Sequence, residues 1–426
     1  MRVLVVGNGA REHALAWKLA QSPAVEALLV APGNAGTAAV ASNVPVSPTD
    51  VEGLVALAKR EAVDLTVVGP EAPLALGLAD RMAEAGLTVF GPTQKAARIE
   101  SSKVFAKELM REVGVPTAPF QVFDDLERAR RYVAKASRPL VVKADGLAAG
   151  KGVILADGPE EALAALERIM ARREFGDAGR RVVIEERLEG REVSVFAFVD
   201  GQTVSPMVTA CDYKRACDGD RGPNTGGMGS YSPPPWWTPE LARQVRERIL
   251  EPVIHALDRM GAPYRGVLYA GLMVTHDGPQ VLEFNCRLGD PEAQAILPRL
   301  KSDLADIMMR AAQGRLGEAS SGDGIAWDPR ACVAVVLASG GYPGDYQTGY
   351  PIEGLDRLDE GVMVFHAGTA LEGPAEDKRV VTAGGRVLTV AALGESLQEA
   401  RRRAYANVER IAFEGAFYRK DIAARV

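Results

Sequence analysis

The sequence predicts a protein of the α/β and α+β multidomain class that begins with a doubly wound parallel-sheet domain. Three observations support this prediction. The chain has 426 residues, enough for about three domains of roughly 150 residues each. The first hundred residues repeat a short apolar strand, a Gly/Pro loop and a helix, the pattern of a doubly wound sheet. From about residue 120 the pattern changes to strands with few helices.

Composition excludes several classes of protein. The hydrophobic fraction is 47% and the charged fraction 25%, both ordinary for a globular protein. The net charge of −6 gives no reason to expect a nucleic-acid or membrane-surface partner, and no apolar run reaches the roughly 18 residues of a membrane span. The 4 cysteines form no C-x-x-C pair and fit neither a zinc site nor a disulfide framework. We therefore expect a cytoplasmic protein.

The N-terminal strands are short and wholly apolar, as in buried parallel strands. Each is followed by a glycine- or proline-containing loop, and ligands of such sheets bind at the carboxyl ends of the strands. The expected strands span residues 3–6, 28–30, 65–68 and 89–90.

The first loop, Gly7–Glu12, resembles a dinucleotide-binding fingerprint but departs from it twice. Glu12 occupies the third glycine position, and the second strand ends in Ala31-Pro32-Gly33 without a carboxylate for a ribose hydroxyl. The helix that follows still offers free N–H groups to an anion. Anion or substrate binding and a merely tight turn both stay open.

The remaining elements are expected in three groups. A helix begins at Ser101 or Ser102 and ends at Gly114, and Asp212–Pro235 is a long loop that is either functional or disordered. A linker is expected at 317–324, and a C-terminal helix at 395–413. The expected strands are 140–143, 152–156, 193–199, 267–274, 281–285, 332–338, 362–366 and 387–391.

The stretch from Lys143 to Gly152 joins two expected strands and contains three glycines between and beside two lysines. It is not a Walker A loop, because the glycine spacing is one residue short and Gly152 replaces Ser/Thr. Exposed backbone N–H groups and lysine charge favour a phosphate-covering lid over a plain exposed hairpin. Lys103 lies in the first turn of its helix, where a cation opposes the helix dipole, so it is either an exposed surface lysine or placed to meet phosphate.

Glu283 and Asn285 are two residues apart on an expected strand and therefore share one face. A carboxylate and an amide oxygen are suitable ligands for Mg²⁺, although an ordinary half-buried strand is the simpler reading. The charged run Arg287–Glu292 directly after the strand favours a site. The strand end at 183–188 is a candidate hinge whose backbone could meet adenine.

These pieces, in this order, resemble the ATP-grasp superfamily, and the finer motifs resemble the phosphoribosylamine–glycine ligase family over nearly the full chain. The motifs are GNGxREH (7–13), APGNAGT (31–37), VGPExPL (68–74), the loop 143–153, GPNTGGMG (222–229), EFNCRxGDPE (283–292), GGYP (340–343) and FHAGT (365–369).

The resemblance implies an N-terminal α/β domain (1–101), an ATP-grasp central domain (102–119 and 190–325), a small lid (120–189) and a C-terminal α+β domain (326–426). It implies a carbon–nitrogen ligase of de novo purine biosynthesis: glycine, 5-phosphoribosylamine and ATP give glycinamide ribonucleotide, ADP and phosphate. The residue inventory, which contains no recognisable activated nucleophile, favours a glycyl phosphate intermediate. We expect ATP with Mg²⁺ or Mn²⁺, small-molecule substrates, and a monomer.

The resemblance also implies roles for individual residues. Catalytic roles are implied for Arg287, Asp212 and Lys214, and metal binding for Glu283 and Asn285. ATP binding is implied for Lys103, Lys143, Gly146, Gly150, Lys151, Gly152, Glu185, Glu186, Leu188 and Glu192. Substrate binding is implied for Gly9, Arg11, Glu12, Gly33, Asn34, Gly36, Thr37, Glu71, Asn224, Thr225, Gly226, Gly227, Met228, Gly229, Asp290, Pro291 and Glu292.

Two positions depart from the family pattern. Tyr213 stands where the family usually has His, and the strand at 269–273 lacks the acidic metal ligand of many ATP-grasp enzymes. The alternatives are another ATP-grasp carboxylate–amine ligase, a biotin-carboxylase-like enzyme, and a nucleotide-binding regulatory module with an inactive site.

Overall fold

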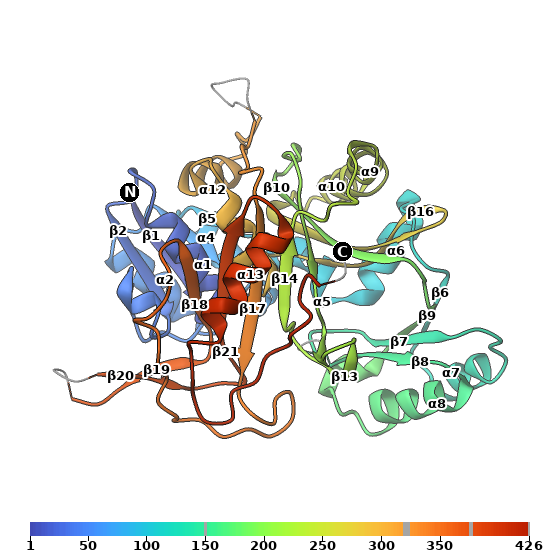
Figure 1. Cartoon of the computed structure of the whole chain (residues 1–426). Helices are drawn as coiled ribbons and strands as arrows, with labels where there is room; N and C mark the ends of the chain where they lie inside the picture. The colour runs from blue at the N-terminus through green and yellow to red at the C-terminus, as the bar shows by residue number, and fades with distance from the viewer. Residues whose placement is uncertain (149–150, 318–323, 375–377, 425–426) are drawn as a thin grey trace.

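The computed structural model describes residues 1–148, 151–317, 324–374 and 378–424. It contains an N-terminal parallel sheet, a small antiparallel sheet set apart from the rest, and a long antiparallel sheet (Figure 1). Gly150, one of the expected phosphate-loop residues, and most of the expected linker at 317–324 lie outside the described residues. The four-part domain division stays a prediction.

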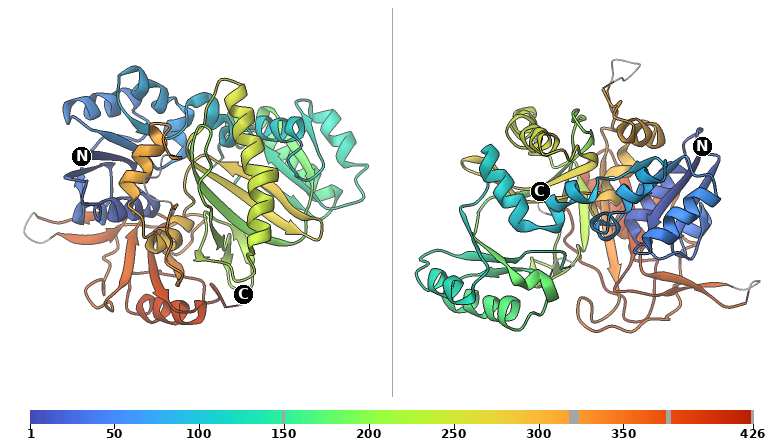
Figure 2. Two further views of the ribbon diagram at one scale, coloured as in Figure 1. Left: turned by 90° about the horizontal axis from the view of Figure 1, so that it is seen from above. Right: turned by 180° about the vertical axis from the view of Figure 1, so that it is seen from behind.

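The N-terminal sheet has five parallel strands in the order β3-β2-β1-β4-β5. Its central strand β1 is buried from Val3 onward because helices cover both faces (Figure 2), which confirms the predicted doubly wound sheet. The strands are β1 (Arg2–Gly7), β2 (Ala27–Pro32), β3 (Ser42–Asn43), β4 (Leu65–Val68) and β5 (Val89–Phe90). The helices are α1 (Ala10–Leu19), η1 (Thr37–Ala39), α2 (Val51–Arg60), α3 (Glu71–Ala75), α4 (Leu78–Glu84) and α5 (Gln94–Ser101).

The small sheet, which we call the lid, has four antiparallel strands in the order β6-β9-β7-β8. It has its own hydrophobic cluster, in which Val142 and Ile184 pack against Leu166 and Ile169. β7 and β8 pair directly, so the glycine-rich stretch does join the two arms of a hairpin. The lid elements are β6 (Phe120–Phe123), α7 (Leu126–Val133), β7 (Leu140–Ala144), β8 (Val153–Ala156), α8 (Pro159–Leu166), η2 (Glu167–Ala171), η3 (Gly176–Arg180) and β9 (Val182–Glu186).

One eight-stranded sheet joins the central and C-terminal parts of the chain, in the order β16-β15-β10-β11-β14-β17-β21-β18. The junction is the antiparallel pairing of β14 with β17. The strands are β10 (Arg191–Asp200), β11 (Val208–Asp212), β14 (Gly229–Ser232), β15 (Arg265–Thr275), β16 (Gly278–Asn285), β17 (Ala331–Ala338), β18 (Val362–His366) and β21 (Arg386–Gly394).

The expectation of a single loop over Asp212–Pro235 is wrong. The segment contains a two-stranded hairpin, β12 (Arg215–Cys217) and β13 (Arg221–Asn224), and then β14. β14 has the sequence Gly-Ser-Tyr-Ser, too short and too polar to be recognised as a strand, yet all four residues are buried between β11 and β17. Tertiary pairing therefore overrides the weak local propensity.

Helices cover this sheet, and the predicted helix after Ser102 is confirmed, with the Ser102 side chain accepting from the N–H of Phe105. The helices are α6 (Lys103–Val113), α9 (Pro239–Val245), η4 (Arg246–Leu250), α10 (Glu251–Arg259), α11 (Glu292–Ile296), η5 (Leu297–Arg299), α12 (Leu304–Ala312) and α13 (Leu397–Val408). A further hairpin is formed by β19 (Thr369–Glu372) and β20 (Arg379–Thr382).

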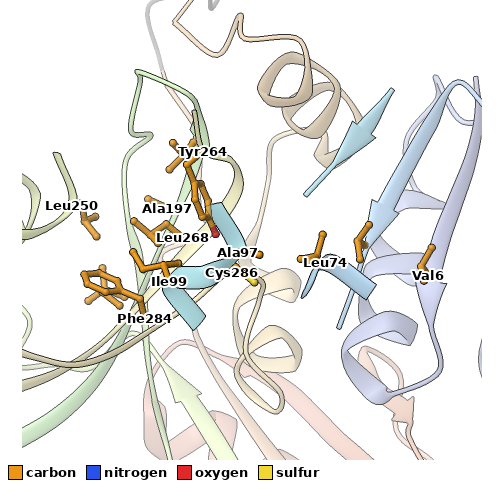
Figure 3. Packing of buried hydrophobic residues seen from close by; sticks show 14 of the residues in the cluster. Val6, Leu74, Ala97, Ile99, Ala197, Leu250, Tyr264, Leu268, Phe284 and Cys286 are labelled. Atoms are coloured by element: carbon orange, nitrogen blue, oxygen red, sulfur yellow. The ribbon is translucent and has the colours of Figure 1, made fainter. Parts of the chain in front are cut away.

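The largest hydrophobic cluster runs from the N-terminal sheet into the central sheet (Figure 3). Val6 and Leu74 belong to the N-terminal part, Ile99 lies on α5 between the two, and Leu268 and Phe284 belong to the central sheet. Burial of these side chains is worth on the order of 2 kcal/mol each, so the two parts are held together by a shared apolar core.

Candidate active site

A cavity of about 1430 Å³ collects charged residues from all parts of the chain. Lys143 and Glu185 come from the lid, Glu283 from the central sheet, Arg11 from the N-terminal helix α1, and Arg386 from β21 of the C-terminal part. Residues of the lid and residues of the central sheet line this cavity together.

Most of the residues predicted from the sequence line this cavity. They are Arg11, Glu71, Lys103, Lys143, Gly146, Lys151, Gly152, Glu185, Leu188, Glu192, Asp212, Lys214, Asn224, Thr225, Gly226, Glu283, Asn285, Arg287, Asp290 and Glu292. The predicted residues that lie outside the lining are Gly9, Glu12, Gly33, Asn34, Gly36, Thr37, Glu186, Gly227, Met228, Gly229 and Pro291.

The residues outside the lining support the cavity walls. Asn34 accepts from the N–H groups of Gly36 and Thr37 and donates to the carbonyl of His366, so it ties the second glycine loop to β18. Glu12 accepts from the backbone N–H of Gly9 at 2.6 Å and so caps the N-terminus of its own helix, α1. Glu186 pairs with Arg138 on the outer surface of the lid.

Two lysines are held at the lid side of the cavity. The Lys143 ammonium lies 2.5 Å from Glu185 and donates to the carbonyl of Leu282 at 2.9 Å. A β-bulge in β16 opposite Gly271 leaves Leu282 unpaired in the ladder, which frees that carbonyl. Lys103 donates to the carbonyl of Gly146 at 3.2 Å, and burial lowers its pKa. Both cations therefore lie beside the glycine-rich loop.

Asp145 explains why a lysine can occupy the first turn of α6. Its carboxylate accepts from the Ser102 hydroxyl and from the N–H of Val104, and it pairs with Arg181. A carboxylate at a helix N-terminus offsets the unfavourable cation. Asp145 also fixes the start of the lid loop to the central part, and the sequence reading had assigned it no role.

Glu283 and Asn285 face the cavity, and their surroundings suit a cation. Among the residues that the structure describes, the Glu283 carboxylate has no hydrogen-bond or ion-pair partner. Burial alone would raise the pKa of Glu283, but Lys214, Lys103 and Lys143 lower it further than burial raises it, so the carboxylate is charged. No group of three or more His, Cys, Asp or Glu suited to a metal occurs in the described ranges. Glu283 and Asn285 alone would supply two oxygen ligands, so a hard cation there would take its remaining ligands from a nucleotide. The Asn285 oxygen accepts from Arg287 at 3.3 Å.

A second charged group occupies the end of the cavity beside the N-terminal part. Arg287 donates to Glu71 at 3.1 Å and to Glu100 at 2.8 Å. Burial would lower the pKa of Arg287, but Glu100 and Glu71 raise it, so the guanidinium stays charged. Arg11 and Arg386 approach the same end. Guanidinium groups suit the recognition of phosphate and carboxylate groups.

Arg386 and Tyr342 were missed by the sequence reading because both lie in the C-terminal part. Arg386 lies 3.3 Å from the carboxylate of Asp290 and donates to the carbonyl of Gly226. The Tyr342 hydroxyl accepts from the N–H of Gly226. The GGYP motif at 340–343 and the isolated Arg386 carried the only signals, and neither shows a site by itself.

Asp212, Lys214 and Glu192 form a third charged group on the central sheet. Lys214 pairs with Glu192. Burial, with Glu292 and Glu192 nearby and Lys214 opposing them, raises the pKa of Asp212 to about 8. A carboxyl group with a pKa near neutrality can both donate and accept a proton in the cavity.

An antiparallel lid and an antiparallel central sheet enclose a cavity with lysines on one side and a carboxylate on the other, and the family model that matches this part of the chain is that of an ATP-grasp ligase domain. Models of phosphoribosylglycinamide synthetase match the chain throughout: the N domain at residues 1–100, the ATP-grasp (A) domain at 101–293 and the C domain at 332–425. The chain belongs to the phosphoribosylglycinamide synthetase family.

Relatives and solved structures agree with this assignment. The chain is 52% identical over 429 residues to the phosphoribosylamine–glycine ligase of Allochromatium vinosum, covering 100% of this chain and 98% of that protein. It is 51% identical over 430 residues to that of Salmonella typhimurium, with the same coverage. A crystal structure of phosphoribosylamine–glycine ligase from Thermotoga maritima superposes with a TM-score of 0.85 at 36% identity, covering 99% of this chain and 100% of that one.

Biotin carboxylase from Campylobacter jejuni superposes with a TM-score of 0.73 over 100% of this chain and 99% of that one, but at 14% identity. That likeness shows the fold alone. It does not favour the biotin-carboxylase-like alternative, because the family models are those of phosphoribosylglycinamide synthetase and the two relatives above are phosphoribosylamine–glycine ligases at 52% and 51% identity. No helix among the described residues is long and apolar enough to cross a membrane.

Proposed function

We propose that this protein joins glycine to 5-phosphoribosylamine at the expense of ATP, giving glycinamide ribonucleotide, ADP and phosphate. One observation carries the proposal. Lys103 and Lys143, whose ammonium groups can bind phosphate, line the same cavity as Glu283, whose carboxylate has no partner among the described residues. The relatives' names supply the particular substrates.

We assign the lid side of the cavity to ATP. The Glu185 side chain is turned to Lys143 and Lys107, which leaves the backbone of the 185–188 segment to face adenine. Lys103, Lys143, Lys151 and the glycines of the loop surround the phosphates. Glu283 and Asn285 would hold a divalent cation, Mg²⁺ or Mn²⁺, which when bound neutralises charge on the terminal phosphates.

We assign the N-terminal end of the cavity to the two other substrates. Arg11, Arg287 and Arg386 supply fixed positive charge for the phosphate of 5-phosphoribosylamine and the glycine carboxylate. Asp290 and Glu71 are carboxylates at the same end and suit the glycine ammonium group. Asp212 lines the same cavity, and we infer that its carboxyl group exchanges protons with the reacting amine.

The chemistry that these groups support is γ-phosphoryl transfer to the glycine carboxylate. A glycyl phosphate forms, the amine of 5-phosphoribosylamine attacks its carbonyl carbon, and phosphate leaves. Within the described ranges the cavity lining holds one cysteine, Cys211, and no serine or histidine. Burial raises the pKa of Cys211 to about 12, so it is a poor nucleophile. Positioning and charge neutralisation supply the rate.

The proposal is tested by measuring ADP release with each substrate omitted in turn. ATP turnover should require glycine, 5-phosphoribosylamine and a divalent cation together, and Mg²⁺ and Mn²⁺ should be compared directly. ATP turnover supported by bicarbonate, or by another carboxylate in place of glycine, would favour a different ATP-grasp reaction. The free cysteines and the charge pattern agree with the expected cytoplasmic location, which fractionation of cells would test.

A further inference from the structure

One wall of the cavity is formed by a hairpin that the eight-stranded sheet does not hold. β12 and β13 pair only with each other, and their neighbours Asp212, Lys214 and Asn224 line the cavity. An isolated two-stranded hairpin is at best marginally stable in water. The geometry of this wall therefore depends on what the hairpin packs against.

The hairpin packs against the C-terminal segment 417–424, through the side chain of Arg419. This guanidinium is 1% exposed. It donates to the carbonyl of Arg215 at 3.1 Å and to the carboxylate of Asp220 at 2.8 Å, both on the hairpin. It also forms a two-pronged ion pair with Asp421, with both contacts at 2.7 Å, which holds it in one orientation.

Arg419 also covers the residue next to the proposed acid–base group. Its guanidinium carbon lies 4.8 Å from the ring centroid of Tyr213. The Tyr213 hydroxyl accepts from the N–H of Ala423 at 2.9 Å, and burial raises the pKa of that hydroxyl. Tyr213 is thus held from both its ring face and its oxygen, and it stands between Asp212 and Lys214 in the chain.

Backbone contacts complete the attachment. The N–H of Gly219 donates to Asp421 at 2.8 Å, and the N–H of Lys420 donates to Asp218 at 2.7 Å. Two segments about two hundred residues apart in sequence therefore exchange hydrogen bonds in both directions.

We propose that Arg419 is a positioning residue for this active site: through Tyr213 and the β12–β13 hairpin, it holds Asp212 and Lys214 at the distance from the substrates that the reaction needs. The ring of Tyr213 is then the surface on which Arg419 packs. The proposal rests on the proposed function for its kinetic consequences, but not for its structural ones.

We expect a kinetic effect because the rate of a reaction is sensitive to small displacements of the reacting groups. A shift of about 1 Å in a catalytic group can lower the rate by about 100-fold. Arg419 touches Asp220 and Tyr213, which both line the cavity, but does not itself line it. Its removal is expected to loosen the wall without removing any group that meets substrate.

The experiment compares Arg419→Met with Arg299→Met. Arg299 is a matched control, because it is 6% exposed and is bound by the Ser232 hydroxyl and two carbonyls, away from the cavity lining. Both variants should melt at a lower temperature. At a temperature where each is folded, Arg419→Met should lose about tenfold or more in kcat, while Arg299→Met keeps the wild-type kcat.

Hydrogen exchange of the wild type and Arg419→Met, measured without substrates, tests the attachment separately. Amides of 215–224 should exchange faster in the variant, while those of β10 and β15 stay unchanged. Unchanged exchange there, or a kcat equal to that of Arg299→Met, would overturn the proposal. Failure of the wild-type substrate-omission assay would instead contradict the proposed function, because the exchange comparison does not depend on it.

A second pair of variants covers the case in which Arg419→Met does not fold. Arg419→Lys keeps the charge but not the planar fork and should give an intermediate kcat. Tyr213→Phe keeps the ring and removes the acceptor of the Ala423 N–H. It should accelerate exchange of the 215–224 amides, and wild-type exchange and kcat in both variants would contradict the role assigned to Arg419.

Discussion

The Lys143 ammonium on β7 lies 2.5 Å from the Glu185 carboxylate on β9, with both side chains buried at the lid side of the cavity. The same carboxylate pairs with Lys107 on α6, so one acid holds two lysines. Burial lowers the pKa of Lys107 to about 8, and Glu185 opposes that effect. Glu185 therefore holds Lys143 and Lys107 in place beside the cavity.

Glu185→Gln should lower the free energy of unfolding by about 3 kcal/mol, because it leaves buried lysines without a carboxylate. Urea denaturation at neutral pH measures the change. Glu186→Gln is the control, since Glu186 is partly exposed and pairs with Arg138 at the surface, where a salt bridge is worth at most about 1 kcal/mol. Equal losses of unfolding free energy in the two variants would show that the buried ion pairs of Glu185 stabilise the fold no more than the surface pair of Glu186.

Glu283→Gln should reduce turnover by about 100-fold or more while leaving the melting temperature near that of the wild type, because charge on the transferred phosphoryl group goes unneutralised. Steady-state kinetics over a range of Mg²⁺ concentrations gives the measurement. Asp277→Asn, at the exposed turn of the same β15–β16 hairpin, should change neither quantity. Wild-type activity with unchanged Mg²⁺ dependence in Glu283→Gln would contradict the metal-binding role that we propose for Glu283.

The buried histidines His13 and His366 predict that stability falls in acid. The backbone N–H of His366 donates to Nδ1 of His13 at 2.8 Å. Nδ1 of His13 accepts this hydrogen bond and must therefore be unprotonated. Burial, with His366 nearby, lowers the pKa of His13 to about 3, and burial lowers that of His366 to about 4. Unfolded histidine has a pKa of about 6.5, so the unfolded state binds more protons between these values.

The free energy of unfolding should therefore decrease as pH falls from about 6.5 to about 4, by at most about 1.4 kcal/mol per pH unit for each of the two histidines. In His13→Asn, whose side-chain oxygen can still accept from His366, this slope should be shallower. His276→Asn, at an exposed position, should leave it unchanged. Parallel slopes in the wild type and His13→Asn would contradict the assignment.

An ATP analogue should protect the described part of the lid loop. Gly146–Ala148 and Lys151–Gly152 line the cavity, and bound phosphates would restrain the backbone of these residues. Hydrogen exchange with and without the analogue should show slower exchange there, while β7 stays unchanged. Equal exchange in both states would count against a phosphate lid.

The sequence alone predicted those parts of the molecule that depend on local pattern. Apolar strands before Gly/Pro loops predicted β1, β2 and β4, and the two-residue spacing of Glu283 and Asn285 predicted their shared exposure to the cavity. Periodicity could not predict β14, because this strand is short and its sequence is polar. Its extended conformation depends on pairing with β11 and β17.

Contacts between residues far apart in the chain could likewise not be predicted from the sequence. Arg386 joins the cavity only because β21 adds to the central sheet, and Arg419 reaches Tyr213 only because the C-terminal segment returns to the hairpin. Asn34 shows the opposite case. Its motif was recognised, but its side chain is occupied by the backbone of its own loop and of His366, so a direct substrate contact stays a prediction.

The central claim is that ATP activates glycine as an acyl phosphate, and oxygen transfer tests it most directly. Glycine carrying heavy oxygen in its carboxylate is turned over with ATP and 5-phosphoribosylamine, and the released inorganic phosphate is analysed by mass spectrometry. One labelled oxygen should pass from each glycine to inorganic phosphate, because the carboxylate oxygen that attacks the γ-phosphorus leaves with it. Unlabelled phosphate, or AMP and pyrophosphate as products, would contradict the account.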